Sequence, residues 1–120
     1  IPTIINKLKT GEKLDLVADP VHDYIYIDDL VRAVWFVAKN AKSLQGQSID
    51  IGTGIQTSNL EILKGLEQIS GLKANVNEIE RMREYDTTNW CANTEIIESL
   101  GWKTKVSLEE GLKTTYENQE

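Results

Sequence analysis

The sequence predicts a small α/β domain, with a small mixed sheet and about four to five helices. Two observations predict this class. Apolar residues recur at helical spacing in several separate segments, and short alternating segments typical of strands lie between them. The chain has 120 residues, so we expect residues 1–120 to form a single domain with a modest core.

The N-terminal segment predicts a helix followed by a strand. Pro2 suits the first turn of a helix, and Gly11 is a suitable residue for its end. Residues 13–17 alternate as a strand does. Because the chain has no initiating methionine and begins inside this helix, we expect it to be a fragment of a longer protein.

The next segment predicts a strand, a helix and a second strand. The alternating residues 23–27 predict the first strand, and a wide apolar stripe predicts a helix from Asp28 onward. Residues 48–52, with the sequence SIDIG, predict the second strand. Together they indicate a βαβ unit with parallel strands and a right-handed crossover.

Two capping boxes mark helix starts in the second half of the chain. Ser58 with Glu61, and Ser107 with Glu110, have the S-x-x-E spacing in which each side chain satisfies a free backbone N–H. Between these helices we expect a strand, a loop and a short helix, which fall at residues 72–80, 81–93 and 94–101.

Asp28 and Asp29 stand where the predicted strand gives way to the helix. Asp is a good N-cap, and its charge also meets the positive end of the helix dipole. This capping role is favoured over catalysis or metal binding, because only Asp23 lies nearby as a further ligand. No metal site is predicted.

Neither the GTG segment nor the single cysteine and histidine indicates a catalytic or cofactor site. The GTG at residues 52–54 lacks the third glycine of a dinucleotide fingerprint, since Thr57 stands there, so a turn role is favoured. Cys91 is the only cysteine and His22 the only histidine, and they lie far apart in the sequence. A thiol nucleophile is therefore not favoured, and no catalytic residue is assigned.

Composition limits the classes of partner. The net charge of −6 argues against nucleic acid, and the longest apolar run, residues 33–38, is too short to cross a membrane. A single cysteine forms no internal disulfide, which favours the reducing cytoplasm. In this acidic chain Arg81 and Arg83 lie two residues apart. They either bind a phosphate together or form a solvated pair on the surface.

Four segments of the chain resemble, in order, the C-terminal part of NAD-dependent nucleotide-sugar epimerases and dehydratases, the extended short-chain dehydrogenase/reductase family. The matching segments are DYIYIDDLVRAV, IDIGTGIQTSNLEIL and NTEIIESLGWKTKVSLEEGL, and they are preceded by a fourth, IPTIINKLKTGEKLDL. The resemblance covers nearly the whole chain.

The resemblance implies the C-terminal substrate domain of a Rossmann-type enzyme without its Rossmann core. A missing N-terminal Rossmann domain would hold NAD or NADP and the Tyr-x-x-x-Lys pair, and no tyrosine of this chain begins that motif. The chain itself would carry no cofactor and would contact the nucleoside diphosphate of a sugar substrate.

The resemblance also implies a set of substrate-binding residues. Arg81 or Arg83 occupies the region of a family arginine that contacts the diphosphate, and His22 replaces a second such arginine. The strand around Leu16 and Val17 corresponds to a region near the nucleotide base.

A rival hypothesis is a stand-alone binding or interaction module that has lost the chemistry. Three departures from the family pattern favour it slightly: His22, and Ala92 and Glu95 in the region where the family has an aspartate and a lysine. If the chain is instead built to pack on a larger partner, we expect exposed apolar surface, and self-association into a homo-oligomer through that surface.

Overall fold

The computed structural model describes residues 1–18, 20–80 and 89–119. These residues form five helices and four short strands. The helices are α1 Pro2–Thr10, α2 Ile27–Lys39, α3 Asn59–Ser70, α4 Glu95–Ser99 and α5 Leu108–Asn118. The strands are β1 Lys13–Leu16, β2 Val21–Asp23, β3 Gln56–Ser58 and β4 Asn75–Glu78.

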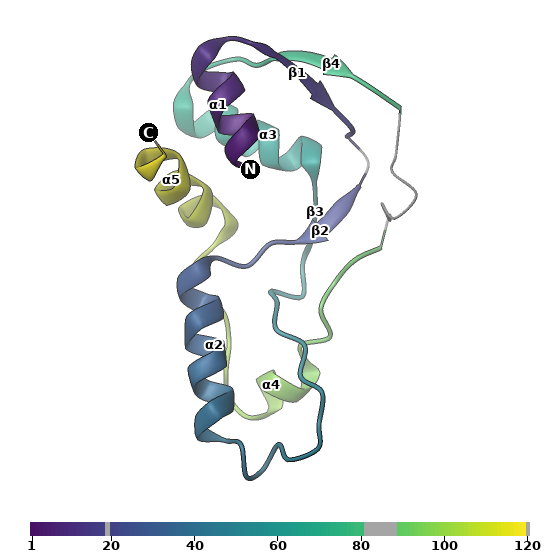
Figure 1. The fold of residues 1–120 in the computed structure, drawn as a ribbon, viewed down its shortest axis with the longest axis vertical. Coiled ribbons are helices and arrows are strands. Elements are labelled where there is room, and N and C mark those ends of the chain that lie inside the picture. Colours follow the sequence, from purple (N-terminus) through teal and green to yellow (C-terminus); the bar gives the residue numbers. More distant parts are fainter. Residues whose placement is uncertain (19, 81–88, 120) are drawn as a thin grey trace.

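The molecule is elongated and has two lobes (Figure 1). Its extents are 51 × 32 × 18 Å, and its radius of gyration is 16.5 Å. A compact domain of this length would have a radius of about 14 Å. An upper lobe contains α1, α3, α5, β1 and β4, and a lower lobe contains α2 and α4, with β2 and β3 between them (Figure 1).

The upper lobe is held together by the apolar faces of its three helices and of β1. Every second residue of β1 is buried, so Leu14 and Leu16 both point into the core beside Leu63 of α3. β1 pairs in parallel with β4. The helices meet at a second cluster, which contains Ile5, Leu8, Ile62, Leu66 and Leu112. Burial of each such side chain contributes about 1.5–3 kcal/mol.

The helix boundaries of the upper lobe follow the local signals in the sequence. Gly11 ends α1 in the left-handed conformation, with φ 71°. Both predicted capping boxes are formed, at Ser58 for α3 and at Ser107 for α5. Both predictions are therefore confirmed. A capping box can be predicted from sequence because it depends only on residues within one turn.

The lower lobe has its own small core. It consists of the fully buried Ala33 and Ile97 with Trp102, against which partly buried apolar side chains pack: Ile25, Phe36, Val37, Ile49 and Ile51. No helix in the described part of the chain is both long and apolar enough to span a membrane.

The predicted βαβ unit is wrong. The strand forms at Val21–Asp23 instead of 23–27, and it pairs with β3 in antiparallel register, with His22 opposite Thr57. Residues 48–52 form no strand. A strand needs a neighbouring strand to bond its backbone, and within the described residues the backbone of 49–51 makes no hydrogen bond.

The predicted N-cap role of the two acids is wrong, whereas their predicted place at the positive end of the helix dipole is confirmed. Tyr26 is the N-cap residue of α2 and makes no side-chain capping bond, while Asp28 and Asp29 lie within the first turn. Asp29 is fully buried. Its carboxylate accepts hydrogen bonds from the backbone N–H groups of Lys105 and Val106, so it joins α2 to the segment that leads into α5.

Candidate functional site

The Asp23 carboxylate fixes the centre of the molecule, where the two lobes meet. It accepts hydrogen bonds from the backbone N–H of Thr53 at 2.8 Å, of Gly54 at 2.9 Å and of Ala92 at 3.2 Å. The Thr53 hydroxyl donates a further bond of 2.5 Å. One side chain at the end of β2 therefore holds two loops that are far apart in the sequence.

These contacts keep Asp23 ionised. Partial burial of the carboxyl raises its pKa, but the bonds from the Thr53 hydroxyl and the backbone N–H groups outweigh this, and the pKa lies below its usual range. Because its oxygens are engaged by four donors, we interpret Asp23 as an anchor for the site and not as a general base.

Gly52 is required for this arrangement. A Cβ atom there would lie 2.5 Å from Asp23 Oδ2 and 2.5 Å from the Ala92 Cβ. The first glycine of the GTG motif therefore makes room for a carboxylate, which would repel a pyrophosphate. Gly54 has a φ of 74°, in the left-handed region of a turn. Residues 52–54 do not fit a dinucleotide site, in agreement with the turn role predicted from the sequence.

His22 lies in a small aromatic group beside this anchor. Its ring centroid is 5.9 Å from that of Tyr24, in an edge-on arrangement, and 5.8 Å from that of Trp90. The three side chains come from β2, from the residues after it and from a loop 68 residues later. Trp90 is 56% exposed, so the group presents a ring to solvent.

Asn59, the first residue of α3, connects this group to the predicted base-binding strand. Its side-chain amide donates a 2.9 Å hydrogen bond to the carbonyl of Val17, and its side-chain oxygen accepts a 3.3 Å bond from the Tyr24 hydroxyl. The structure therefore places the end of β1 near β2. Sequence reasoning missed Asn59, Tyr24 and Trp90, because no local motif marks side chains that meet only in the fold.

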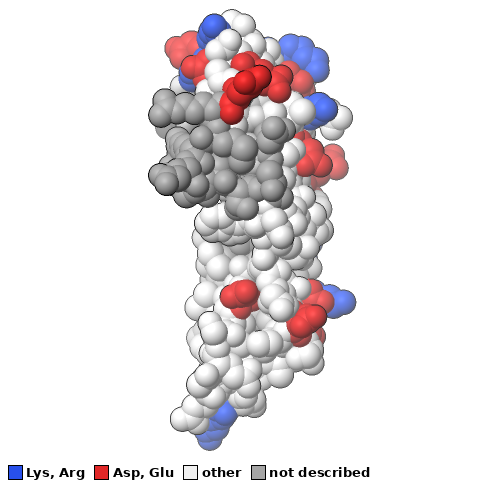
Figure 2. Space-filling model, turned by 90° about the vertical axis from the view of Figure 1, so that its right-hand side faces the viewer, with Lys and Arg blue, Asp and Glu red and all other residues white. Residues whose placement is uncertain are grey.

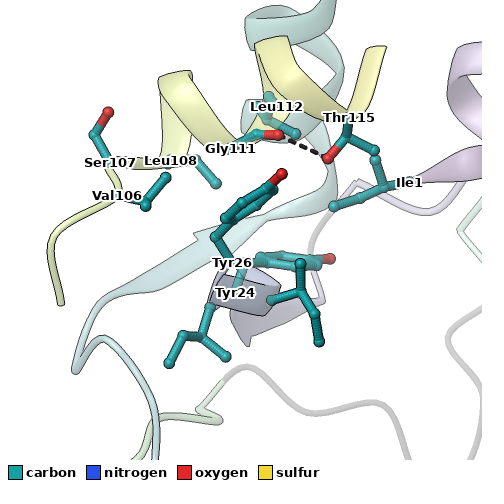
Figure 3. Close-up of a pocket in the computed structure, with 11 residues that line it drawn as sticks. Ile1, Tyr24, Tyr26, Val106, Ser107, Leu108, Gly111, Leu112 and Thr115 are labelled. Atoms are coloured by element: carbon teal, nitrogen blue, oxygen red, sulfur yellow. Dashed lines mark hydrogen bonds between the residues drawn. The ribbon is translucent and has the colours of Figure 1, made fainter. Parts of the chain in front are cut away.

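A separate hollow of about 190 Å³ lies between Tyr26 and the start of α5. In Figure 3 the rings of Tyr24 and Tyr26 lie below α5, and Leu112 and Thr115 face them. Tyr26 packs closely because its contact on α5 is Gly111, where a Cβ would lie 3.1 Å from the ring. The lining is mainly apolar and includes Ile1, so this hollow adds no chemistry to the site.

The predicted site residues fall into three groups. His22 is half-buried in the aromatic group. The Leu16 side chain is buried in the upper-lobe core, and the half-buried Val17 contributes its carbonyl to Asn59. Arg81 and Arg83 lie outside the described residues.

Metal and thiol chemistry find little support in the described part of the chain. No group of three or more His, Cys, Asp or Glu side chains there is arranged to hold a metal ion. Cys91 is exposed, with its sulfur 3.9 Å from Asp23 Oδ2. Although Cys91 is exposed, the loss of some water around its thiol, together with the charge of Asp23 and the hydrogen bond to it, raises the pKa of Cys91, which keeps it protonated and weakly nucleophilic.

One face of the molecule has little charge between the lobes (Figure 2). Figure 2 shows most acidic and basic side chains of this face toward the upper lobe, with a band of uncharged surface below the grey atoms. Ile55 and Trp90 are exposed apolar side chains, at 65% and 56% exposure, and each lies one or two residues from a backbone N–H that bonds to Asp23.

The fold agrees with that of a nucleotide-sugar epimerase, and a family model also matches the chain. The model of one family in this class, described as GDP-mannose 4,6 dehydratase, matches residues 1–115. Because the match covers almost the entire chain, the chain belongs to this family.

Relatives of known activity support the same class. CDP-abequose synthase from Salmonella muenchen is 32% identical over 116 residues, which cover 94% of this chain and 39% of the relative. The dTDP-D-glucose 4,6-dehydratase of Mus musculus is 30% identical over 125 residues, covering 98% of this chain and 35% of the relative.

A solved structure extends the comparison to three dimensions. The UDP-glucuronic acid 4-epimerase from Bacillus cereus, in complex with UDP-glucuronic acid and NAD, superimposes with a TM-score of 0.85 at 27% identity. The match covers 95% of this chain and 37% of that one. The chain therefore spans between a third and two fifths of the length of the relatives named here.

Proposed function

We propose that this chain is the substrate-binding part of an NAD(P)-dependent nucleotide-sugar epimerase or dehydratase. It contacts the nucleoside diphosphate of the substrate and does not catalyse the reaction alone. The observation that carries the proposal is the similarity of nearly the whole chain to an epimerase structure whose complex contains UDP-glucuronic acid and NAD. That similarity extends over 95% of this chain.

The support for diphosphate binding comes from the cationic and aromatic side chains that the family resemblance assigns to the substrate, and not from the Asp23 carboxylate. His22, the residue that replaces a family arginine, packs against the rings of Tyr24 and Trp90. Arg81 and Arg83 follow β4 in the sequence and supply the cationic forks that bind phosphate best. Leu16 and Val17, at the end of β1, would shape the surface beside the nucleotide base.

The NAD or NADP of the intact enzyme would be held by another part of the protein. Residues 52–54, which resemble part of a dinucleotide motif, enclose the Asp23 carboxylate and have no room for a pyrophosphate. When bound, the cofactor supplies the transient oxidation of the sugar and the return of the hydride. This chain would bind the nucleoside diphosphate of the substrate during the reaction.

Calorimetry with UDP-, dTDP-, CDP- and GDP-sugars tests the proposal. We expect one nucleotide class to bind the protein that contains this chain together with its nucleotide-binding portion. Arg81→Ala and Arg83→Ala should weaken binding by about 1.5–3 kcal/mol at the arginine that holds the diphosphate. Lys113→Ala, which removes one exposed positive charge on α5, is the matched control and should bind normally.

The outcome against the proposal is equally definite. Absence of binding for all four classes would contradict the substrate-binding role. Unchanged affinity in both arginine variants would remove that pair from the site while leaving the role of the domain intact.

The rival function is a stand-alone binding or interaction module in the same family. The replacements at His22, Ala92 and Glu95 favour it, since each departs from a family position. The native reading frame separates the two: a dinucleotide fingerprint and Tyr-x-x-x-Lys upstream would favour the enzyme. We further place the protein in the cytoplasm, where its single exposed cysteine would stay reduced.

A further inference from the structure

Asn59 contacts the chain on both sides of the connection between β1 and β2. Its side-chain NH2 group donates a 2.9 Å hydrogen bond to the carbonyl of Val17, just after β1. Its side-chain oxygen accepts a 3.3 Å bond from the hydroxyl of Tyr24, just after β2. Its backbone N–H donates at 3.3 Å to the carbonyl of Pro20, between the two strands. The first residue of α3 is therefore bonded to residues 17–24 at three points.

The side chain of Asn59 is not needed to begin its helix. The N-terminus of α3 is already capped by the reciprocal bonds between Ser58 and Glu61. Both partners of the Asn59 side chain lie outside α3, 42 and 35 residues earlier in the chain. The orientation of the amide is also fixed, because a backbone carbonyl only accepts and the NH2 group must face Val17. The side chain therefore acts between elements and not within the helix.

The same residue is closely connected to the predicted phosphate side. Thr57, two residues before Asn59, is buried and stands opposite His22 in the pairing of β2 with β3. The ring of Tyr24, whose hydroxyl bonds to Asn59, lies edge-on to His22 with 5.9 Å between the ring centroids. Asn59 therefore sets the place of Val17, on the predicted base side, relative to His22, on the predicted phosphate side.

Resting on the proposed function, we propose that Asn59 is a positioning residue that sets the preference of the site for one nucleotide base. A surface discriminates between bases only when it is held in place relative to the diphosphate, which all nucleotides share. Loss of the bond to Val17 frees the end of β1 to shift and to accept other bases. The diphosphate contacts remain. Asn59 itself does not touch the substrate in this arrangement.

The test measures the dissociation constants of UDP-glucose, dTDP-glucose, CDP-glucose and GDP-mannose by calorimetry. The protein is the one that contains this chain together with its nucleotide-binding portion. The readout is the ratio of the affinities for the preferred nucleotide and for the second. Asn59→Ala should reduce this ratio about fivefold, the order expected for one lost hydrogen bond. A variant that is only less well folded would bind with a lower stoichiometry and an unchanged ratio.

Two further variants separate the two side-chain bonds. Asn59→Asp keeps the shape and the acceptor for the Tyr24 hydroxyl but removes the donor to Val17, so the ratio should fall as in Asn59→Ala. Tyr24→Phe retains the bond to Val17, so the ratio should stay at the wild-type value. The matched control is Asn75→Ala, an exposed asparagine opposite Lys13 at the other end of β1. It should change neither the affinities nor their ratio.

An unchanged ratio in Asn59→Ala or in Asn59→Asp would overturn the positioning role. An equal fall in Tyr24→Phe would also overturn it, because the loss would then follow a general loosening of the site, and so would a wild type that binds all four nucleotides equally. Each of these results leaves the substrate-binding role intact, since nucleotide sugars still bind. Failure of the wild type to bind any of the four would instead reject the proposed function, and this inference with it.

Discussion

The Asp29 carboxylate lies in the first turn of α2 and bonds to backbone groups more than 70 residues further along. Its Oδ2 accepts from the N–H groups of Lys105 and Val106, each at 2.9 Å, and Arg32 donates to the other oxygen. Burial raises the pKa of Asp29, but the N–H groups and Arg32 outweigh this and hold the pKa below its usual range. Because Asp29 is fully buried, its charge is stabilised only by these partners.

Asp29→Asn should therefore destabilise the protein strongly. The asparagine amide has the same shape as the carboxylate but no charge. Its NH2 group is a donor, so it would face a donor at a position where a carboxylate oxygen accepts a hydrogen bond. We expect a loss of about 3 kcal/mol in the free energy of unfolding, measured by urea denaturation. Asp28→Asn is the matched control, because Asp28 is an exposed acid in the same turn and its loss should cost about 0.3–1 kcal/mol. Equal losses in the two variants would contradict the anchoring role.

The same variant predicts a pH dependence. A lowered pKa in the folded state means that Asp29 contributes stability above its unfolded pKa of about 3.9, and that this contribution is lost as the pH falls through the folded value. The stability difference between wild type and Asp29→Asn should be constant near neutral pH and shrink in acid below about pH 4. A difference that stays constant down to pH 2 would show that packing, and not charge, causes the loss.

The neighbouring acids show what the sequence can predict at this scale. Asp28 and Asp29 have the same residue type and both stand near a helix start, so the sequence indicates a structural role for both. Which one is exposed and which is buried depends on Lys105 and Val106, which reach Asp29 only in the folded chain.

At the scale of single elements, α3 depends on its N-terminal capping box. The Ser58 hydroxyl accepts from the Glu61 N–H at 3.2 Å, and the Glu61 carboxylate accepts from the Ser58 N–H at 2.7 Å. Ser58→Ala removes one half of this exchange and should cost about 1 kcal/mol in urea denaturation. Ser48→Ala, at an exposed position outside any helix, is the control and should change stability by less than about 0.5 kcal/mol. A Ser58→Ala loss no larger than the control would contradict the role of the cap.

Helices were predictable to within a few residues, whereas only some strands were: the predicted segments 13–17 and 72–80 contain β1 and β4, but 48–52 forms no strand. The signals for α1, α3 and α5 lie within one or two turns of the chain, and the structure confirms them. A strand depends on a partner elsewhere. Residues 13–16 pair with β4 and form a strand. Residues 48–52 have an equally suitable pattern, but they have no neighbouring strand among the described residues.

At the scale of the whole molecule, the candidate site is assembled from segments that the sequence separates. The family resemblance predicts binding roles for His22 and for the strand end at Val17, but it does not predict the side chains that contact them. Trp90 and Asn59 reach these residues from other elements. Such contacts have no period or spacing in the sequence, so only the fold can show them.

The exposed apolar surface expected from the sequence is confirmed on α2, and its effect on association remains a prediction. In the absence of a partner, apolar area on one molecule is buried most readily against the same area on another, so the isolated chain should self-associate as its concentration rises. Trp35→Glu places a charge at the centre of this surface and should keep the chain monomeric in sedimentation equilibrium. Leu72→Glu changes an exposed apolar residue of the upper lobe and should associate as the wild type does. If both variants remain associated, the contact lies elsewhere; if the wild type stays monomeric at millimolar concentration, the apolar surface alone does not drive association.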